Sequence, residues 1–242
     1  MIVLKLGGSV VTEKSSPETV ATDALARAAD AVAGRHRDLV LVHGGGSFGH
    51  PHAERYGVTR TEGSREAAAI TDVHGAMKEL NAVVVGALTE RGVPAVPVHP
   101  LSFASRDADS VLSLPVEAPR RMLDEGFVPV LHGDVVVHEG RGATVVSGDE
   151  LVVALARGLD ADRVGLCSDV PGVLDGSDEV IDRVETFEDV ADSLGESEST
   201  DVTGGMAAKV RALLDLGAPA NVFDLDGLAP FLDGADPGTR IG

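Results

Sequence analysis

The chain has 242 residues, of which 43% are hydrophobic, enough to bury a substantial core and too many for a disordered segment. The 39 acidic and 20 basic residues give a net charge of −19, which argues against non-specific nucleic-acid binding. The single cysteine, Cys167, excludes an intrachain disulfide, and no apolar run is long enough to cross a bilayer.

We expect a cytoplasmic protein that binds neither nucleic acid nor membranes, because no signal peptide is recognisable after Met1. The acidic residues are spread along the whole chain, and lysine is scarce beside arginine. This composition suggests the cytoplasm of a salt-accumulating organism, a hypothesis that predicts unfolding when salt is removed.

Short runs rich in β-branched residues alternate with helical patterns along the chain. Strands are predicted at 2–7, 38–43, 94–99, 128–133, 163–169 and 221–225, with a hairpin over 135–146 that turns at 139–142. The strands are almost wholly apolar, which is typical of a mainly parallel sheet buried on both faces.

Apolar residues at helical spacing predict helices between these strands. One helix is expected over 17–36, with Ser16 as its N-cap and Pro17 at its first position, and a longer one over 65–91. This order predicts helices on both faces of one sheet, and no linker or internal repeat divides the chain. Residues 192–200 are polar and are predicted to form a loop.

Three of the four lysines lie in or beside glycine-rich turns. Lys5 belongs to the sequence KLGGS, Lys14 follows nine residues later, and Lys209 ends the sequence TGGMAAK. An ammonium group beside exposed backbone N–H groups is suited to binding phosphate. Two such turns far apart in the chain predict a site that binds a polyphosphate from two sides, and hence phosphoryl transfer.

A third glycine-rich turn, GGGSFGH at 44–50, follows the second predicted strand. Ligands of open α/β sheets bind at the carboxyl ends of the strands, and His50 is placed there to donate a hydrogen bond to an anion. The same glycines fit the dinucleotide pattern G-x-G-x-x-G, so a nicotinamide or flavin enzyme is an alternative, although the motif follows the second strand instead of the first. The other histidines show no metal-ligand spacing, and no metal-binding side chain is predicted.

Two further turns carry polar residues. Thr203 is the expected N-cap of a helix whose free N–H groups and Lys209 form an anion site, and SGDE at 147–150 begins another helix. Ser168 and Asp169 end a strand where a nucleotide would bind. No G-x-x-x-x-G-K-[ST] sequence is present, which excludes a P-loop enzyme.

These motifs, in this order, resemble the amino acid kinase superfamily: KLGGS, then VHGGGSFGH, SDVPGV, TGGMAAK and the closing GTRI. Within it, His50, AMKELN at 76–81 and SGDE are similar to those of archaeal isopentenyl phosphate kinases. The resemblance implies a three-layer αβα sandwich around a mainly parallel sheet, usually a homodimer. It also implies ATP-dependent phosphorylation of isopentenyl phosphate to isopentenyl diphosphate with Mg²⁺, a step of isoprenoid biosynthesis by a mevalonate route.

The resemblance also implies roles for individual residues of a single domain spanning 1–242, with the phosphate acceptor in about 1–160 and ATP in about 161–242. Those expected at ATP are Lys5, Leu6, Gly7, Gly8, Ser9, Gly46, Ser168, Asp169, Gly205 and Lys209. Gly45, His50 and Gly148 are expected at the acceptor, and Lys14 at the transferring phosphoryl group. Lys5, Lys14, His50 and Lys209 are the expected catalytic residues.

Other activities of the same fold stay open from sequence. Its kinases also act on acetylglutamate, carbamate, uridylate or fosfomycin, and the fold includes oxyanion-storage proteins without enzymatic activity. Storage does not require Lys14 and Lys209 together. An acceptor that is already a phosphate needs no general base, and the sequence contains no convincing base dyad. Both points favour the phosphate-acceptor kinase.

Overall fold

In residues 1–194 and 205–242, which the computed structural model describes, eight strands form one sheet in the order β10-β12-β11-β9-β1-β2-β6-β3. The strands are β1 (Ile2–Leu6), β2 (Leu39–His43), β3 (Ala95–Pro97), β6 (Val128–His132), β9 (Arg163–Cys167), β10 (Arg183–Val184), β11 (Ala220–Phe223) and β12 (Thr239–Ile241). All neighbouring pairs are parallel except β11 and β12. The mainly parallel sheet expected from the sequence is therefore confirmed.

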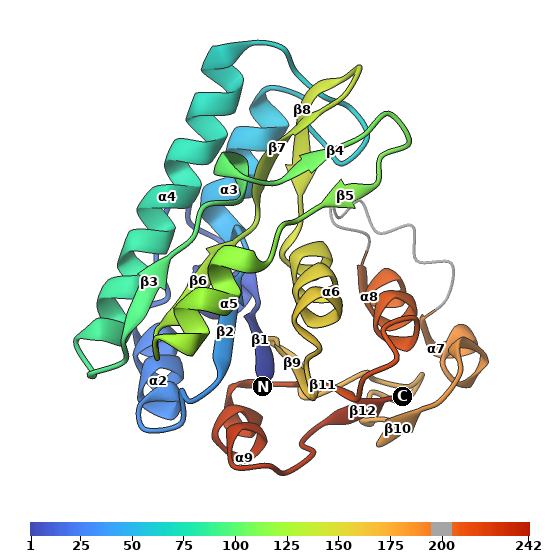
Figure 1. The fold of residues 1–242 in the computed structure, drawn as a ribbon. Coiled ribbons are helices and arrows are strands. Elements are labelled where there is room, and N and C mark those ends of the chain that lie inside the picture. The colour runs from blue at the N-terminus through green and yellow to red at the C-terminus, as the bar shows by residue number, and fades with distance from the viewer. Residues whose placement is uncertain (195–204) are drawn as a thin grey trace.

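Helices cover both faces of this sheet (Figure 1). One face carries α1 (Gly8–Val11), α2 (Thr22–Val32), α3 (Gly46–Arg55), α4 (Ala67–Thr89) and α9 (Leu228–Leu232). The other carries α5 (Glu117–Asp124), α6 (Gly148–Leu159) and α8 (Gly205–Leu214), with α7 (Ala191–Leu194) beside α8. The described residues also form three short 3₁₀ turns, η1 (Pro100–Ser102), η2 (Phe187–Asp189) and η3 (Leu225–Gly227). These layers confirm the αβα arrangement.

Burial on both faces explains why β1 is apolar at every position except Lys5. Val3 belongs to the core beneath α6 and α8, whereas Leu4 and Leu6 belong to the core beneath α2 and α4. Successive side chains of a strand point to opposite faces, so a strand covered on both faces needs apolar residues at every position. Lys5 is the exception, on the α6 side and 8% exposed.

A second, four-stranded sheet lies beyond the carboxyl end of the first, in the order β5 (Leu112–Ser113), β4 (Ser105–Arg106), β7 (Asp134–His138) and β8 (Gly142–Val146) (Figure 1). β7 and β8 form the hairpin predicted over 135–146. β4 and β5 have two residues each, too few to produce a periodic pattern, and the sequence did not predict them.

The helix predicted over 17–36 is too long at both ends, because α2 spans Thr22–Val32. α2 begins at Thr22, so the assignment of Ser16 and Pro17 to its first turn is wrong. Residues 12–20 instead form a loop whose ends are joined by a β-bridge between Thr12 and Val20. Tertiary contacts of this loop prevail over the local helix-start signal.

The remaining predicted elements match closely within the described residues. The helix predicted over 65–91 is α4, and the helix expected after SGDE is α6. Of the loop predicted over 192–200, residues 192–194 belong to α7 and the rest lies outside the described residues, as does the predicted N-cap Thr203. The described helices include none that is long and apolar enough to span a membrane.

Candidate active site

A cavity of about 590 Å³ opens at the carboxyl ends of β1, β2 and β9. Parallel strands end at one edge of the sheet, so the three turns that follow them meet there although they are far apart in sequence. They place Gly7 to Ser9, Gly44 to Gly46, and Ser168 with Asp169 on its wall. The volume lies within the usual range for small-molecule sites.

The first two glycine turns pack backbone against backbone. A Cβ atom on Gly8 would lie 2.6 Å from the nitrogen of Gly46, and one on Gly44 would lie 2.5 Å from the nitrogen of Gly8. Real Cβ atoms do not approach so closely, so larger residues would force the turns apart. Thr12 stabilises the contact between the two turns, because its hydroxyl donates to the Gly8 carbonyl at 2.8 Å and accepts from the Ser47 amide at 3.0 Å.

Two helices direct their amino-terminal ends at the cavity. α3 begins at Gly46 and α6 at Gly148, and both glycines line the wall. The backbone N–H groups of Gly46 and Gly148 donate to no acceptor within residues 1–194 and 205–242. Free first-turn N–H groups, together with the helix dipole, favour a bound anion.

Two lysines at the cavity are held by aspartates. Lys5 donates from Nζ to Oδ1 of Asp149 at 2.7 Å, and both side chains are largely buried. Lys14 pairs with Asp169, which also accepts a hydrogen bond from Ser9 at 3.0 Å. Lys14 is far more exposed than Lys5. The two cations thus reach the cavity from different elements.

The pKa of Asp169 reflects this pairing. Its partial burial would raise the pKa, but the hydrogen bonds from Lys14 and Ser9 outweigh burial and lower it. The carboxylate is therefore charged at neutral pH and holds Lys14 near the cavity.

One end of the cavity combines a histidine with apolar side chains. His50 is exposed on α3 and lines the wall beside Gly45 and Gly49. Val73 and Met77, from the apolar seam of α4, lie next to them, and a Cβ on Gly49 would meet the Met77 sulfur at 2.7 Å. A ligand here would meet hydrogen-bond donors at one side and apolar surface at the other.

The cavity gathers nearly all the residues that the sequence predicted for the site. Those on its wall are Lys5, Gly7, Gly8, Ser9, Lys14, Gly45, Gly46, His50, Gly148, Ser168, Asp169 and Lys209. Leu6 and Gly205 are not on the wall. The Leu6 side chain is in the core, and its carbonyl accepts from the Gly44 amide at 2.9 Å. Gly205 begins α8, which carries Lys209.

Sequence reasoning missed two residues that organise the site. Asp149 was recognised as part of a turn into a helix, but only Gly148 was assigned a role, although an acid beside that glycine was an available signal. Thr12 carries no sequence signal, because its contact with Ser47 bridges 35 positions and forms only in the tertiary structure.

Four histidines, His43, His74, His99 and His132, lie close together, with neighbouring ring centroids 5.2 to 6.3 Å apart. His43 donates from Nδ1 to the Gly44 carbonyl at 3.0 Å, and His132 donates from Nδ1 to the Gly133 carbonyl at 2.9 Å. Burial lowers the pKa of each to about 4. No group of three or more His, Cys, Asp or Glu side chains in the described ranges is arranged to hold a metal ion.

Comparison with known proteins shows similarity along nearly the whole chain. The model of the amino acid kinase family matches residues 1–219. An isopentenyl phosphate kinase from Haloferax volcanii is 63% identical over 243 aligned positions, covering 100% of this chain and 98% of that protein. One from Methanothermobacter thermautotrophicus is 36% identical, covering 88% of this chain and 86% of that protein. An X-ray structure of isopentenyl phosphate kinase superposes with a TM-score of 0.86 at 31% identity, covering 100% of both chains.

Proposed function

The chain belongs to the amino acid kinase family, and on that premise we propose that it transfers the terminal phosphoryl group of ATP to isopentenyl phosphate. The products are isopentenyl diphosphate and ADP. The observation that carries the proposal is the composition of the cavity, which joins two sets of anion-binding groups to an apolar end. A polyphosphate donor and a phosphate acceptor with a hydrocarbon tail match those three features.

We assign the ATP phosphates to the turns after β1 and β9. The first group comprises Lys5 and Leu6 at the end of β1, with Leu6 contributing only backbone, and the turn Gly7–Ser9 that follows. The nucleotide side is completed by Gly46, Ser168, Asp169, Gly205 and Lys209. With this assignment ATP contacts both parts of the single domain, through six residues of 1–160 and four of 161–242, and the acceptor contacts residues of 1–160.

We assign the acceptor phosphate to His50, Gly45 and Gly148. His50 donates to a phosphate oxygen, and the amino-terminal ends of α3 and α6 supply backbone N–H groups. The hydrocarbon tail then extends along Val73 and Met77, which already line the wall. This division gives each half of the acceptor a surface of matching polarity.

The reaction needs positioning and charge neutralisation more than proton transfer. The acceptor is an ionised phosphate oxygen, so no general base has to activate it. The obstacle is repulsion between two polyanions, which Lys5, Lys14 and Lys209 reduce by lining the same cavity. Asp149 and Asp169 hold Lys5 and Lys14 in place before the substrates bind.

Mg²⁺ is the expected companion of the nucleotide. Mg²⁺ can draw most of its ligands from phosphate and water, which fits a cavity where Asp149 and Asp169 are already paired with Lys5 and Lys14. When bound, it neutralises part of the phosphate charge. We further propose a homodimer that works in the cytoplasm at high salt, on the basis of the family resemblance and the net charge of −19.

The test is ADP release from Mg²⁺-ATP in molar KCl with five acceptors: isopentenyl phosphate, acetylglutamate, carbamate, uridylate and fosfomycin. Turnover with isopentenyl phosphate alone supports the proposal. Turnover with another acceptor instead would refute the acceptor assignment and retain the kinase. No turnover with any of them, in protein shown to be folded by circular dichroism, would favour oxyanion storage.

A further inference from the structure

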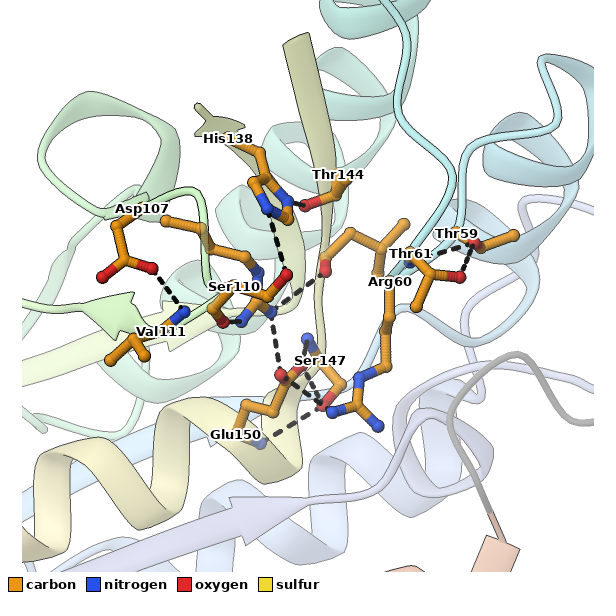
Figure 2. A network of polar contacts seen from close by, with 12 residues as sticks. Thr59, Arg60, Thr61, Asp107, Ser110, Val111, His138, Thr144, Ser147 and Glu150 are labelled. Carbon is orange, nitrogen blue, oxygen red and sulfur yellow. Dashed lines mark hydrogen bonds and ion pairs between the residues drawn. The ribbon is translucent and has the colours of Figure 1, made fainter. Parts of the chain in front are cut away.

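Arg106 is a buried arginine outside the cavity, on strand β4 of the small sheet. Its side chain is 5% exposed, and its guanidinium donates to three acceptors from different segments. They are the Ser110 carbonyl at 3.2 Å, the Val145 carbonyl at 3.3 Å and Oε1 of Glu150 at 2.8 Å. Figure 2 shows Ser110 and Glu150 within this polar network.

Glu150 connects Arg106 to the first turn of α6. Its second carboxylate oxygen, Oε2, accepts from the Ser147 amide at 2.9 Å and from the Ser147 hydroxyl at 3.0 Å, and the Ser147 hydroxyl accepts from the Glu150 amide at 3.2 Å (Figure 2). This reciprocal arrangement is a capping box. The Glu150 carboxylate thus binds Arg106 through Oε1 and the helix cap through Oε2.

Two residues enclosed by this cap face the cavity. Gly148 and Asp149 are the first two residues of α6, between the cap residue Ser147 and Glu150. Both line the cavity, and Asp149 holds Lys5 at 2.7 Å. Any rotation of the first turn would therefore move the Gly148 amide and the Asp149 carboxylate together.

Arg106 is placed to prevent such a rotation. It contacts Val145 near the end of β8 and Glu150 in the helix, so it spans the junction at which strand β8 becomes α6. Its Nε atom is buried and has no hydrogen-bond partner within the described residues. Burying an incompletely paired guanidinium opposes stability, and an apolar residue would fill the space without that penalty. A role in positioning accounts for a cation at this place.

We propose that Arg106 is a positioning residue: through Glu150 it fixes the first turn of α6, and with it the Gly148 amide and the Asp149 carboxylate at the cavity. The inference rests on the proposed function for its kinetic consequence. The geometric part of the proposal, the orientation of the Gly148 peptide, does not depend on which reaction the protein catalyses.

Arg60 provides a matched control. It donates to the same oxygen of Glu150, at 3.2 Å, but its side chain is 45% exposed and the pair is open to solvent. Exposed ion pairs of this kind contribute little. Arg60→Gln removes a positive charge from Glu150 without disturbing the buried contacts.

The experiment compares Arg106→Met, Arg106→Lys and Arg60→Gln by steady-state kinetics, thermal unfolding and the ¹H–¹⁵N signal of the Gly148 amide. Arg106→Met is expected to raise KM for isopentenyl phosphate at least tenfold and to move the Gly148 signal. Arg106→Lys should raise KM less, because an ammonium keeps the charge but not the planar set of donors. Arg60→Gln should stay within twofold of the unmodified protein.

A fall in melting temperature without a change in KM or in the Gly148 signal would overturn the proposal, since Arg106 would then act on stability alone. If Arg106→Met does not fold, Arg106→Lys decides the question, and an unchanged KM and Gly148 signal in that variant also overturn it. If the unmodified protein does not phosphorylate isopentenyl phosphate, the proposed function fails, and the Gly148 signal alone then decides on Arg106.

Discussion

Two buried histidines, His43 and His132, should make the stability of the protein decrease in acid. His43 lies fully inside the core at the end of β2, where burial lowers its pKa from 6.5 to about 4. In the unfolded chain the same ring takes up a proton near its ordinary pKa. Between these values the unfolded state binds more protons than the folded state, so stability decreases as the pH falls from 6.5 to about 4.

The magnitude follows from the size of the shift. A difference of about 2.5 pKa units at about 1.4 kcal/mol per unit amounts to roughly 3 kcal/mol lost at the acidic end of this range. His132, the neighbour of His43 in the sheet register, has its pKa lowered to a similar value. Against a total stability of about 5–15 kcal/mol, the loss from even one ring is large.

The assay is chemical denaturation at a series of pH values between 7 and 4, at fixed KCl, for the unmodified protein and for His43→Gln. Acidic groups contribute to the pH dependence of both, so the informative quantity is the difference between the two slopes. The variant should lose stability less steeply, by up to one proton or about 1.4 kcal/mol per pH unit. His132→Gln should behave alike. Equal slopes in all three proteins would refute the conclusion that these rings are buried and neutral.

Four further predictions concern the site and the surface. His50→Ala should raise KM for isopentenyl phosphate ten- to hundredfold, because a hydrogen bond to a charged group contributes about 1.5–3 kcal/mol; an unchanged KM would remove His50 from the acceptor site. Lys14→Ala should lower kcat about a hundredfold with little change in KM for ATP, as expected for a donor that acts in the transition state; steady-state kinetics with an unaltered kcat would exclude it from the mechanism. Burial lowers the pKa of His52, but the carboxylates of Asp72 and Glu18, at 2.8 and 2.7 Å, outweigh burial and raise it. The stability that these two contacts of His52 supply is complete below about pH 6.5 and is lost as the pH rises through the raised pKa. The melting temperature should therefore fall about 2–4 °C more in the unmodified protein than in His52→Gln between pH 6 and 9. Dialysis from molar to millimolar KCl should lower the melting temperature, since the Debye length grows from about 3 Å to about 30 Å or more and the net charge of −19 is no longer screened; a melting temperature independent of salt would contradict a halophilic origin of that charge.

The strands and glycine turns could be predicted from the sequence because the properties that define them are local. A strand covered on both faces needs apolar residues in succession, as in Leu39–His43, and glycines that allow close backbone approach occur together, as at 44–46. In a parallel sheet these turns then meet at one edge, and together with the family resemblance this indicated most of the predicted residues that line the cavity.

Contacts between segments that are distant in the sequence were decided only by the tertiary structure. Residues 12–20 have a local helix-start signal at Ser16 and Pro17 but form a loop, because the Thr12–Val20 bridge and the contact of Glu18 with His52 stabilise another conformation. The pairing of Lys5 with Asp149 joins residues 144 positions apart.

The contact between Arg106 and Glu150 spans 44 positions and depends on a two-residue strand. No local pattern encodes such contacts, since they arise only when the sheet and its helices bring those side chains within hydrogen-bonding distance. The sequence by itself therefore determined the architecture and the composition of the site, and the fold decided how its charged groups are held.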